Sequence, residues 1–213
     1  MEPFHFYTKL DLTILLGLQA KNVTELLECI QVAPESSVYH HTHRFLQQHH
    51  YLSPEPPNDF AYWITDVLND PALGEKLSSV DVIQFSSLSD LRNRFVEIME
   101  SHLTNNARRP ESPPGEEFHF MACQTFAFHT PYIATDLSEF KEMLTRVSIN
   151  SLYYHVFDAK LRLERGENDF SRWFRDRGET ALADELKRLD PYTYTLEGLR
   201  NKIMKLVDKY DKD

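Results

Sequence analysis

Ser37-Val38-Tyr39-His40-His41 decides the fold, because it returns as Ser151-Leu152-Tyr153-Tyr154-His155 at an offset of 114 residues. Neighbouring stretches repeat in the same order. They are Phe4-His5-Phe6 with Phe118-His119-Phe120, Asn58-Asp59-Phe60 with Asn168-Asp169-Phe170, Trp63 with Trp173, and Leu91-Arg92-Asn93 with Leu199-Arg200-Asn201. Self-similarity of this kind is the signature of a repeated structural unit. The sequence therefore predicts two tandem homologous modules related by pseudo-twofold symmetry.

The repeats divide the 213 residues into a first module at 1–104, a linker at 105–117 and a second module at 118–213. The linker contains three prolines and several charged residues, a composition typical of connecting segments. Each module is close to the usual size of a domain, and the whole chain is long enough to bury a sizeable core. We expect the two modules to pack on each other.

Each module is predicted to begin with a short strand. Aromatic residues alternate with other residues at Phe4–Tyr7, and the same alternation opens the second module at Phe118–Met121. A period of two residues is typical of a strand, because successive side chains of a strand point to opposite faces. We expect the two strands to pair with each other.

The remaining patterns are those of helix N-termini. Asn22 followed by Glu25 matches the capping box that precedes a helix, and Asp136 followed by Glu139 does the same, so helices are predicted near 23–32 and 137–147. Further helices are predicted to begin at Ser36 or Ser37, Asn150 or Ser151, Asn58 or Asp59, Asn168 or Asp169, Ser87 and Thr195. The predicted fold class is mainly α, of the α+β type, with a short strand and about four helices in each module.

The distribution of charged residues indicates which classes of partner the protein can bind. Acidic residues exceed basic residues by ten, and residues 1–117 hold most of the excess, with 8 Lys and Arg against 17 Asp and Glu. Such a surface repels a phosphate backbone, so we expect no nucleic-acid partner. The second module carries a predicted basic patch for an anion or an acidic partner, formed by Arg162, Arg165, Arg172, Arg175 and Arg177.

The chain has only two cysteines, Cys29 and Cys123, which excludes a disulfide framework and a cysteine-rich zinc site. It contains no apolar run of about 18 residues, and its first segment lacks the charged and apolar regions of a signal peptide. We therefore expect a soluble cytoplasmic protein without a membrane partner. No cofactor is predicted, and no pattern selects an oligomeric state.

Five histidines gather in the first module, at His40, His41, His43, His49 and His50. Imidazoles at helical spacing can converge on a transition metal such as zinc or iron, with oxygen from Asp59 or Glu55. The spacing does not favour this, because the i, i+4 pair of known metal-binding helices is absent among the five. Only His41 has a histidine counterpart, His155. The prediction is therefore no metal site, with His41 and Asp59 as the weak alternative ligands.

His41 and His155 are each predicted to point inward, and an inward histidine needs a hydrogen-bond partner. Asp59 and Asp169 begin the next helix of their modules and are the candidate partners. The favoured interpretation is a buried His–Asp pair that fixes the packing of two helices. The competing interpretation makes His41, Asp59, His155 and Asp169 candidate catalytic or ligand-binding residues, in which each carboxylate orients an imidazole.

The aromatic residues beside these histidines have two interpretations. Tyr39, Tyr153, Trp63 and Trp173 lie at helical spacing among apolar neighbours, which favours a place in the core over a platform for sugar rings. The segment of His49, His50 and Tyr51 belongs to the first module alone and precedes a proline-rich loop, which favours a specialised contact. The candidate ligand-binding residues are therefore Tyr39, His49, His50, Tyr51 and Tyr153.

The sequence resembles an uncharacterised prokaryotic family known only as a domain of unknown function. The resemblance is carried by Ser-x-Tyr-x-His at Ser37–His41, Asn-Asp-Phe-x-x-Trp at Asn58–Trp63, their repeats in the second module, and the segment Asp190–Glu197. Members of this family occur alone or beside glycosyltransferases of the trehalose and storage-glucan type. The resemblance therefore implies a role near sugar metabolism and a glycosyltransferase or other enzyme as partner.

Two functions are compatible with these patterns. The chain lacks a phosphate-binding glycine loop, a nucleophile elbow and a His-Glu-x-x-His pair, which favours a non-catalytic binding or regulatory module. The alternative is a small enzyme, metal-assisted or using His/Asp acid–base chemistry, that acts on a phosphorylated or glycosylated metabolite. Whether the chain is an enzyme is left open by the sequence.

Overall fold

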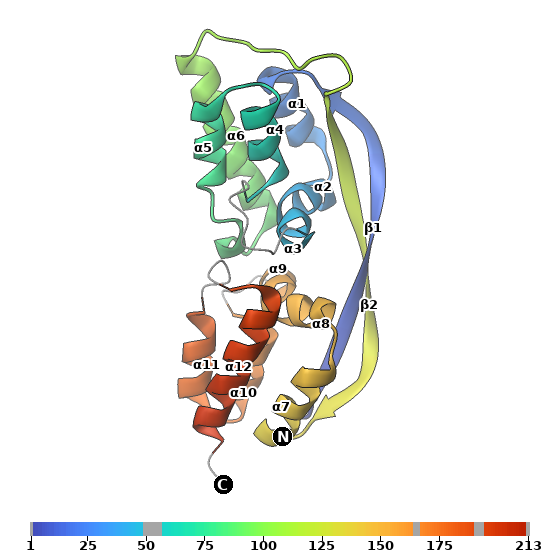
Figure 1. Cartoon of the computed structure of the whole chain (residues 1–213), viewed down its shortest axis with the longest axis vertical. Coiled ribbons are helices and arrows are strands. Elements are labelled where there is room, and N and C mark those ends of the chain that lie inside the picture. Colours follow the sequence, from blue (N-terminus) through green and yellow to red (C-terminus); the bar gives the residue numbers. More distant parts are fainter. Residues whose placement is uncertain (1, 49–56, 164–166, 190–193, 212–213) are drawn as a thin grey trace. The chain divides into compact units, whose positions relative to one another are not determined.

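The computed structural model describes residues 2–48, 57–163, 167–189 and 194–211. These residues form two compact units (Figure 1). The described part of residues 11–124 makes up one, which we call the N unit. Residues 2–10 and the described part of residues 125–213 make up the other, the C unit. The fold is mainly α with one two-stranded antiparallel sheet, as the sequence predicted.

The sheet consists of β1 (Phe4–Ala20) and β2 (Phe118–Ala134), which are hydrogen-bonded to each other. The predicted pairing of the two strands is therefore present. Each strand contributes to both units: residues 4–10 of β1 and 125–134 of β2 belong to the C unit, and the remaining parts of both strands belong to the N unit. The compact units thus follow other boundaries than the predicted modules, and the duplication itself stays a prediction.

Helices of the N unit pack on each other beside its strand segments (Figure 1). In chain order they are α1 (Val23–Val32), α2 (Glu35–Tyr39), η1 (His40–Arg44), α3 (Phe45–Gln48), α4 (Asp59–Asp66), α5 (Pro71–Ser78), η2 (Val82–Gln84) and α6 (Leu88–Asn105). The strand face toward these helices is apolar. Phe118 and Phe120 are buried there, and their rings contact Phe60 of α4.

The C unit has a similar order of elements. They are α7 (Leu137–Arg146), α8 (Ile149–Tyr153), η3 (Tyr154–Asp158), α9 (Ala159–Leu163), α10 (Asp169–Asp176), α11 (Thr180–Lys187) and α12 (Leu196–Tyr210). Here the buried aromatic residues of the strand come from the start of the chain. Phe4 and Phe6 pack against Phe140 of α7 and Phe170 of α10.

The N-caps of the helices can be compared with those predicted from the sequence. Both predicted N-caps form, because the side chain of Asn22 accepts from the backbone N–H of Glu25 and that of Asp136 accepts from Glu139. Each glutamate side chain accepts in return from the N–H of the residue before the cap, Lys21 or Thr135. Ser87 and Thr195 cap α6 and α12 as predicted. The predicted caps of the second helices were wrong. The N-caps there are Pro34, without a side-chain bond, and Ser148, whereas Ser37 and Ser151 lie buried within the helices.

Two further differences concern length. The strands run for 17 residues, whereas short ones were predicted. The alternation fails after Tyr7, and β1 includes Gly17 at φ +74°, a backbone conformation that favours glycine. The helices α5 and α11 were not predicted. Asp70 followed by Pro71 was an available pattern for α5, because a capping residue before proline is typical of a helix start.

Candidate functional site

His41 lies on the π-helical turn η1, at the centre of the N unit. Its Nδ1 is 2.7 Å from Oδ2 of Asp59, the first residue of α4. Its Nε2 accepts a hydrogen bond from the backbone N–H of Met121 on β2, at 3.0 Å. The imidazole is 1% exposed. One side chain therefore joins a π-turn, a helix start and a strand.

His155 makes the corresponding contacts in the C unit. It lies on η3, and its Nδ1 is 2.7 Å from Oδ2 of Asp169 at the start of α10. Its Nε2 accepts from the backbone N–H of Tyr7 on β1, at 2.8 Å. The predicted His–Asp contacts are thus both present. The strand bond adds a third partner that the sequence did not reveal.

These contacts fix the protonation state of both rings. A backbone N–H can only donate, so each Nε2 must carry a lone pair and each Nδ1 must carry the proton that it donates to the carboxylate. Burial lowers the pKa of His155, which keeps the ring neutral. Neither nitrogen of either ring has a free position for a proton in transit or for a metal ion. The geometry therefore matches a packing role.

The two tryptophans fasten the same strand segments at their other end. Nε1 of Trp63 donates to the backbone oxygen of Glu116 at 2.8 Å, and Nε1 of Trp173 donates to that of Glu2 at 3.1 Å. Each segment is thereby held by a tryptophan before its first phenylalanine and by a histidine after its second. We call each such arrangement a strand latch: His41, Asp59, Phe60 and Trp63 in the N unit, and His155, Asp169, Phe170 and Trp173 in the C unit.

The strand latches explain why Asn-Asp-Phe-x-x-Trp occurs twice. Asn58 caps α4 by accepting from the N–H of Ala61, and Asn168 caps α10 by accepting from Ser171. The aspartate that follows orients the histidine, the phenylalanine enters the core, and the tryptophan bonds the strand. Trp63 and Trp173 are 6% and 8% exposed, so they belong to the core. The spacing of the motif therefore places all four side chains, each with its own contact, at the beginning of the same helix.

The other histidines of the first module do not converge. Nδ1 of His40 is 3.2 Å from Sγ of Cys123, and Nδ1 of His43 is 3.1 Å from the hydroxyl oxygen of Thr42. His49, His50 and Tyr51 lie outside the described residues. Within the described ranges, no three His, Cys, Asp or Glu side chains are placed to share a metal ion.

Tyr39 and Tyr153, the other predicted ligand-binding residues, are buried at 8% and 2% exposure. The ring of Tyr39 stacks on His43, and that of Tyr153 contacts Phe157 and lies under the amino group of Lys9. His5 and His119 are exposed on their strands. The predicted preference for core packing of these tyrosines agrees with their burial.

The C unit has an open pocket of about 530 Å³ beside its strand latch. The start of β1, η3, α9 and α10 form its walls. The lining side chains are aromatic or ionisable almost throughout: Glu2, Pro3, Phe4, His5, Tyr7, Tyr154, His155, Arg162, Asp169, Arg172, Trp173 and Asp176. The size lies in the usual range for small-molecule sites. We call it the latch pocket.

The structure separates the members of the predicted basic patch. Arg175 is paired with Glu167 and Asp184, and Arg177 lies over the ring of Trp173 and donates to the backbone oxygen of Glu2. The other three arginines do not join them. Arg162 and Arg172 line the latch pocket, and Arg165 lies outside the described residues.

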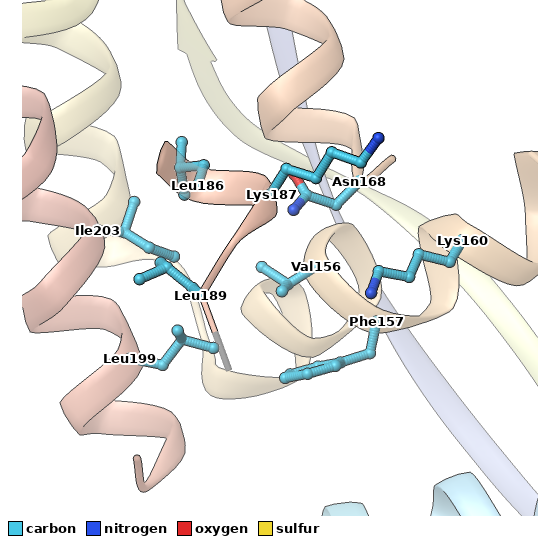
Figure 2. Close-up of a pocket in the computed structure, with 9 residues that line it drawn as sticks. All are labelled: Val156, Phe157, Lys160, Asn168, Leu186, Lys187, Leu189, Leu199 and Ile203. Atoms are coloured by element: carbon cyan, nitrogen blue, oxygen red, sulfur yellow. The ribbon is translucent and has the colours of Figure 1, made fainter. Parts of the chain in front are cut away.

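A second pocket of the C unit lies between η3, α9 and the helices α11 and α12 (Figure 2). Leucine and isoleucine side chains line one side of it, and Lys160, Lys187 and Asn168 lie on the other. Its free volume is about 20 Å³, which is room for a single water molecule. This pocket is too small for a metabolite, so the latch pocket is the better candidate site.

Both strands expose large apolar side chains. In the N unit Leu12, Ile14 and Leu15 of β1 are 48%, 44% and 65% exposed, and in the C unit Phe126 and Phe128 of β2 are 39% and 49% exposed. Exposed apolar side chains that cluster along one element often mark a surface for a partner. In the described ranges, no helix is long and apolar enough to cross a membrane.

The protein is thus a mainly helical one in which histidine and tryptophan residues fasten strand segments to each helical unit. The chain belongs to a family of unknown function, DUF5752, whose model matches residues 1–208. It is also similar to a solved structure, OrfY from Thermoproteus tenax, with 28% identity and a TM-score of 0.82. The similarity covers 99% of this chain and 96% of that one. No curated protein matches the chain.

Proposed function

We propose that the protein is a non-catalytic binding or regulatory module. The observation that carries this proposal is the row of exposed leucine and isoleucine side chains on β1 of the N unit. An apolar row of this kind costs solubility, and a protein partner that covers it removes the cost. The strand latches support the same conclusion, because their imidazoles have both nitrogens bound within the fold.

The resemblance supplies the class of partner. The resemblance implies a neighbourhood of glycosyltransferases of the trehalose and storage-glucan type, so we propose an enzyme of this class, in the cytoplasm, as the partner. Apolar side chains then supply the affinity between the two proteins, and the charged surface affects only the rate at which they associate. Binding is expected to change the activity of the partner and to require no chemistry by this chain.

The alternative function, a small His/Asp or metal-assisted enzyme, has one observation in its favour. The pair of His155 and Asp169 borders the latch pocket, which brings an imidazole and a carboxylate next to an open volume. Both ring nitrogens would first have to leave their present partners. Turnover of a phosphorylated sugar by the purified protein, abolished in His155→Gln, would establish the enzyme and refute the module.

The test of the module uses a purified glycosyltransferase of the trehalose type from the same organism. We expect the two proteins to elute together in size-exclusion chromatography. The double variant Leu12→Ser, Ile14→Ser should raise the dissociation constant at least 10-fold, because these two exposed side chains lie on the same face of β1 and both are lost. Val32→Ser is the matched control, since Val32 is 74% exposed but lies on α1. Equal affinity of both variants, or no association of the native protein, would refute the proposal.

A further inference from the structure

The latch pocket contains four ionisable side chains that are not used by the fold. Arg172, Asp176, Glu2 and His5 line it, and none of the four makes a side-chain hydrogen bond or ion pair within the described ranges. Arg162 differs from them. It donates to Asp169 at 2.6 Å and stacks on the ring of Tyr154 at 4.0 Å, so it is a wall of the pocket held in place by the strand latch.

Two of the unused groups, of opposite charge, lie on one face of a helix. Arg172 and Asp176 are four residues apart on α10, and side chains at this spacing lie one above the other on the same face. A guanidinium binds phosphate or carboxylate oxygens through two parallel hydrogen bonds. Carboxylates accept from hydroxyl groups. A molecule that fills the pocket therefore needs an anionic group at one end and hydroxyl donors at the other.

The walls between these ends are aromatic. Tyr7, Tyr154 and Trp173 line the pocket. Arg162 and Arg177 lie over the rings of Tyr154 and Trp173, which are each 8% exposed, so the half-buried ring of Tyr7 offers the most aromatic surface for the apolar C–H side of a sugar ring. The corresponding positions of the N unit carry other residues, because Tyr62 stands in place of Arg172 and Met121 in place of Tyr7. The chemistry of this pocket is thus a property of the C unit.

We propose that the latch pocket binds a phosphorylated sugar, with the phosphate on Arg172 and the hydroxyl groups on Asp176 and Glu2. The site is independent of the apolar row of β1, so it goes beyond the proposed function. A metabolite that occupies it also contacts the segment Glu2–Tyr7, which the strand latch holds. Binding is therefore expected to stabilise the C unit against unfolding.

Isothermal titration calorimetry of the full chain tests the site, with glucose 6-phosphate, glucose, glucuronate and inorganic phosphate as probes. We expect glucose 6-phosphate to bind, and glucose or phosphate alone to bind at least 10-fold more weakly, because each lacks one half of the recognised groups. Glucuronate separates a carboxylate ligand from a phosphate ligand. Tighter binding of glucuronate, equal binding of inorganic phosphate, or no heat with any probe would overturn the proposal.

Variants locate the ligand within the chain. Arg172→Gln should weaken the binding of glucose 6-phosphate about 10- to 100-fold, since a charge-assisted pair is lost. Arg188→Gln removes the same charge from an exposed position of the C unit outside the pocket and should bind like the native protein. Both variants should melt at the native temperature. Equal binding by the two variants would place the ligand elsewhere and refute the site.

Discussion

At the residue scale, the chain uses histidine as a neutral connector. His41 and His155 each accept a strand N–H and donate to a carboxylate, so both polar atoms of the ring are satisfied in a buried place. The sequence identified these residues and their aspartate partners, because both repeat and because the two histidines fall on the inward face of a predicted helix. It did not identify the strand N–H groups, because backbone donors leave no trace in the side-chain pattern.

The buried histidines make stability depend on pH. Burial, together with the neighbouring His41, lowers the pKa of His40 from 6.5 to about 4, and burial also lowers that of His155. The unfolded chain binds these protons at higher pH than the folded chain does. Stability is therefore full above pH 6.5 and decreases as the pH falls toward 4, by up to about 1.4 kcal/mol per pH unit for each histidine.

Urea unfolding between pH 4.5 and 7.5 measures this dependence. His40→Gln, which cannot take up the proton, should show a smaller decrease than the native protein over the same range. The exposed His119→Gln is the control and should leave the decrease unchanged. A free energy of unfolding that stays constant from pH 7.5 to 4.5 would show that the buried imidazoles do not resist protonation.

At the scale of elements, local capping patterns predicted most helix starts, and periodicity failed where the backbone departs from regular geometry. The turns η1 and η3 are π-helical, with an extra residue per turn that no side-chain pattern announces. His41 and His43 are two residues apart, a spacing that places side chains on different sides of a regular α-helix. Both are 1% exposed, because the π-turn is covered on more than one side. The long strands were missed since their alternation is interrupted.

One helix pair depends on a single glycine. A Cβ atom at Gly74 of α5 would overlap the hydroxyl group of Thr65 on α4, and its next contacts would be at 3.2 and 3.4 Å. We expect Gly74→Ala to destabilise the N unit by about 1–3 kcal/mol, the usual range for overpacking. Thr65→Ala should relieve the clash, so the double variant should regain most of the stability in urea unfolding. A double variant no better than Gly74→Ala alone would show that the backbone, and not Thr65, resists the methyl group.

At the scale of the whole molecule, each compact unit includes a strand segment that packs against helices distant from it in sequence. Residues 2–10 begin the chain but belong to the C unit, and residues 118–124 belong to the N unit. The sequence predicted modules with uninterrupted boundaries, because a repeat shows which residues correspond and not which copies touch. The candidate site could be predicted only in part for the same reason. The sequence identified the basic residues Arg162 and Arg172, but not that Glu2 and His5 line the same pocket.

Hydrogen–deuterium exchange tests this arrangement with a matched pair of variants. Phe4→Ala with Phe6→Ala should speed amide exchange in α7 and α10, more than 130 residues away in sequence, because these rings fill the C unit. Phe118→Ala with Phe120→Ala should speed exchange in α4 and η1. Each change thus acts mainly on helices of the other half of the sequence. Faster exchange mainly in α1 after the first change would contradict the assignment.

The strand latch of the C unit also has a consequence for how the chain is made. The backbone N–H of Tyr7 donates to His155, 148 residues later, so the segment Phe4–Tyr7 leaves the ribosome well before its partners exist. During that time Phe4 and Phe6 have no core to enter. Long-range closure of this kind slows folding and exposes apolar segments to wrong contacts. Synthesis of this protein is therefore expected to depend on chaperones that shield the segment Phe4–Tyr7 until its helices are made.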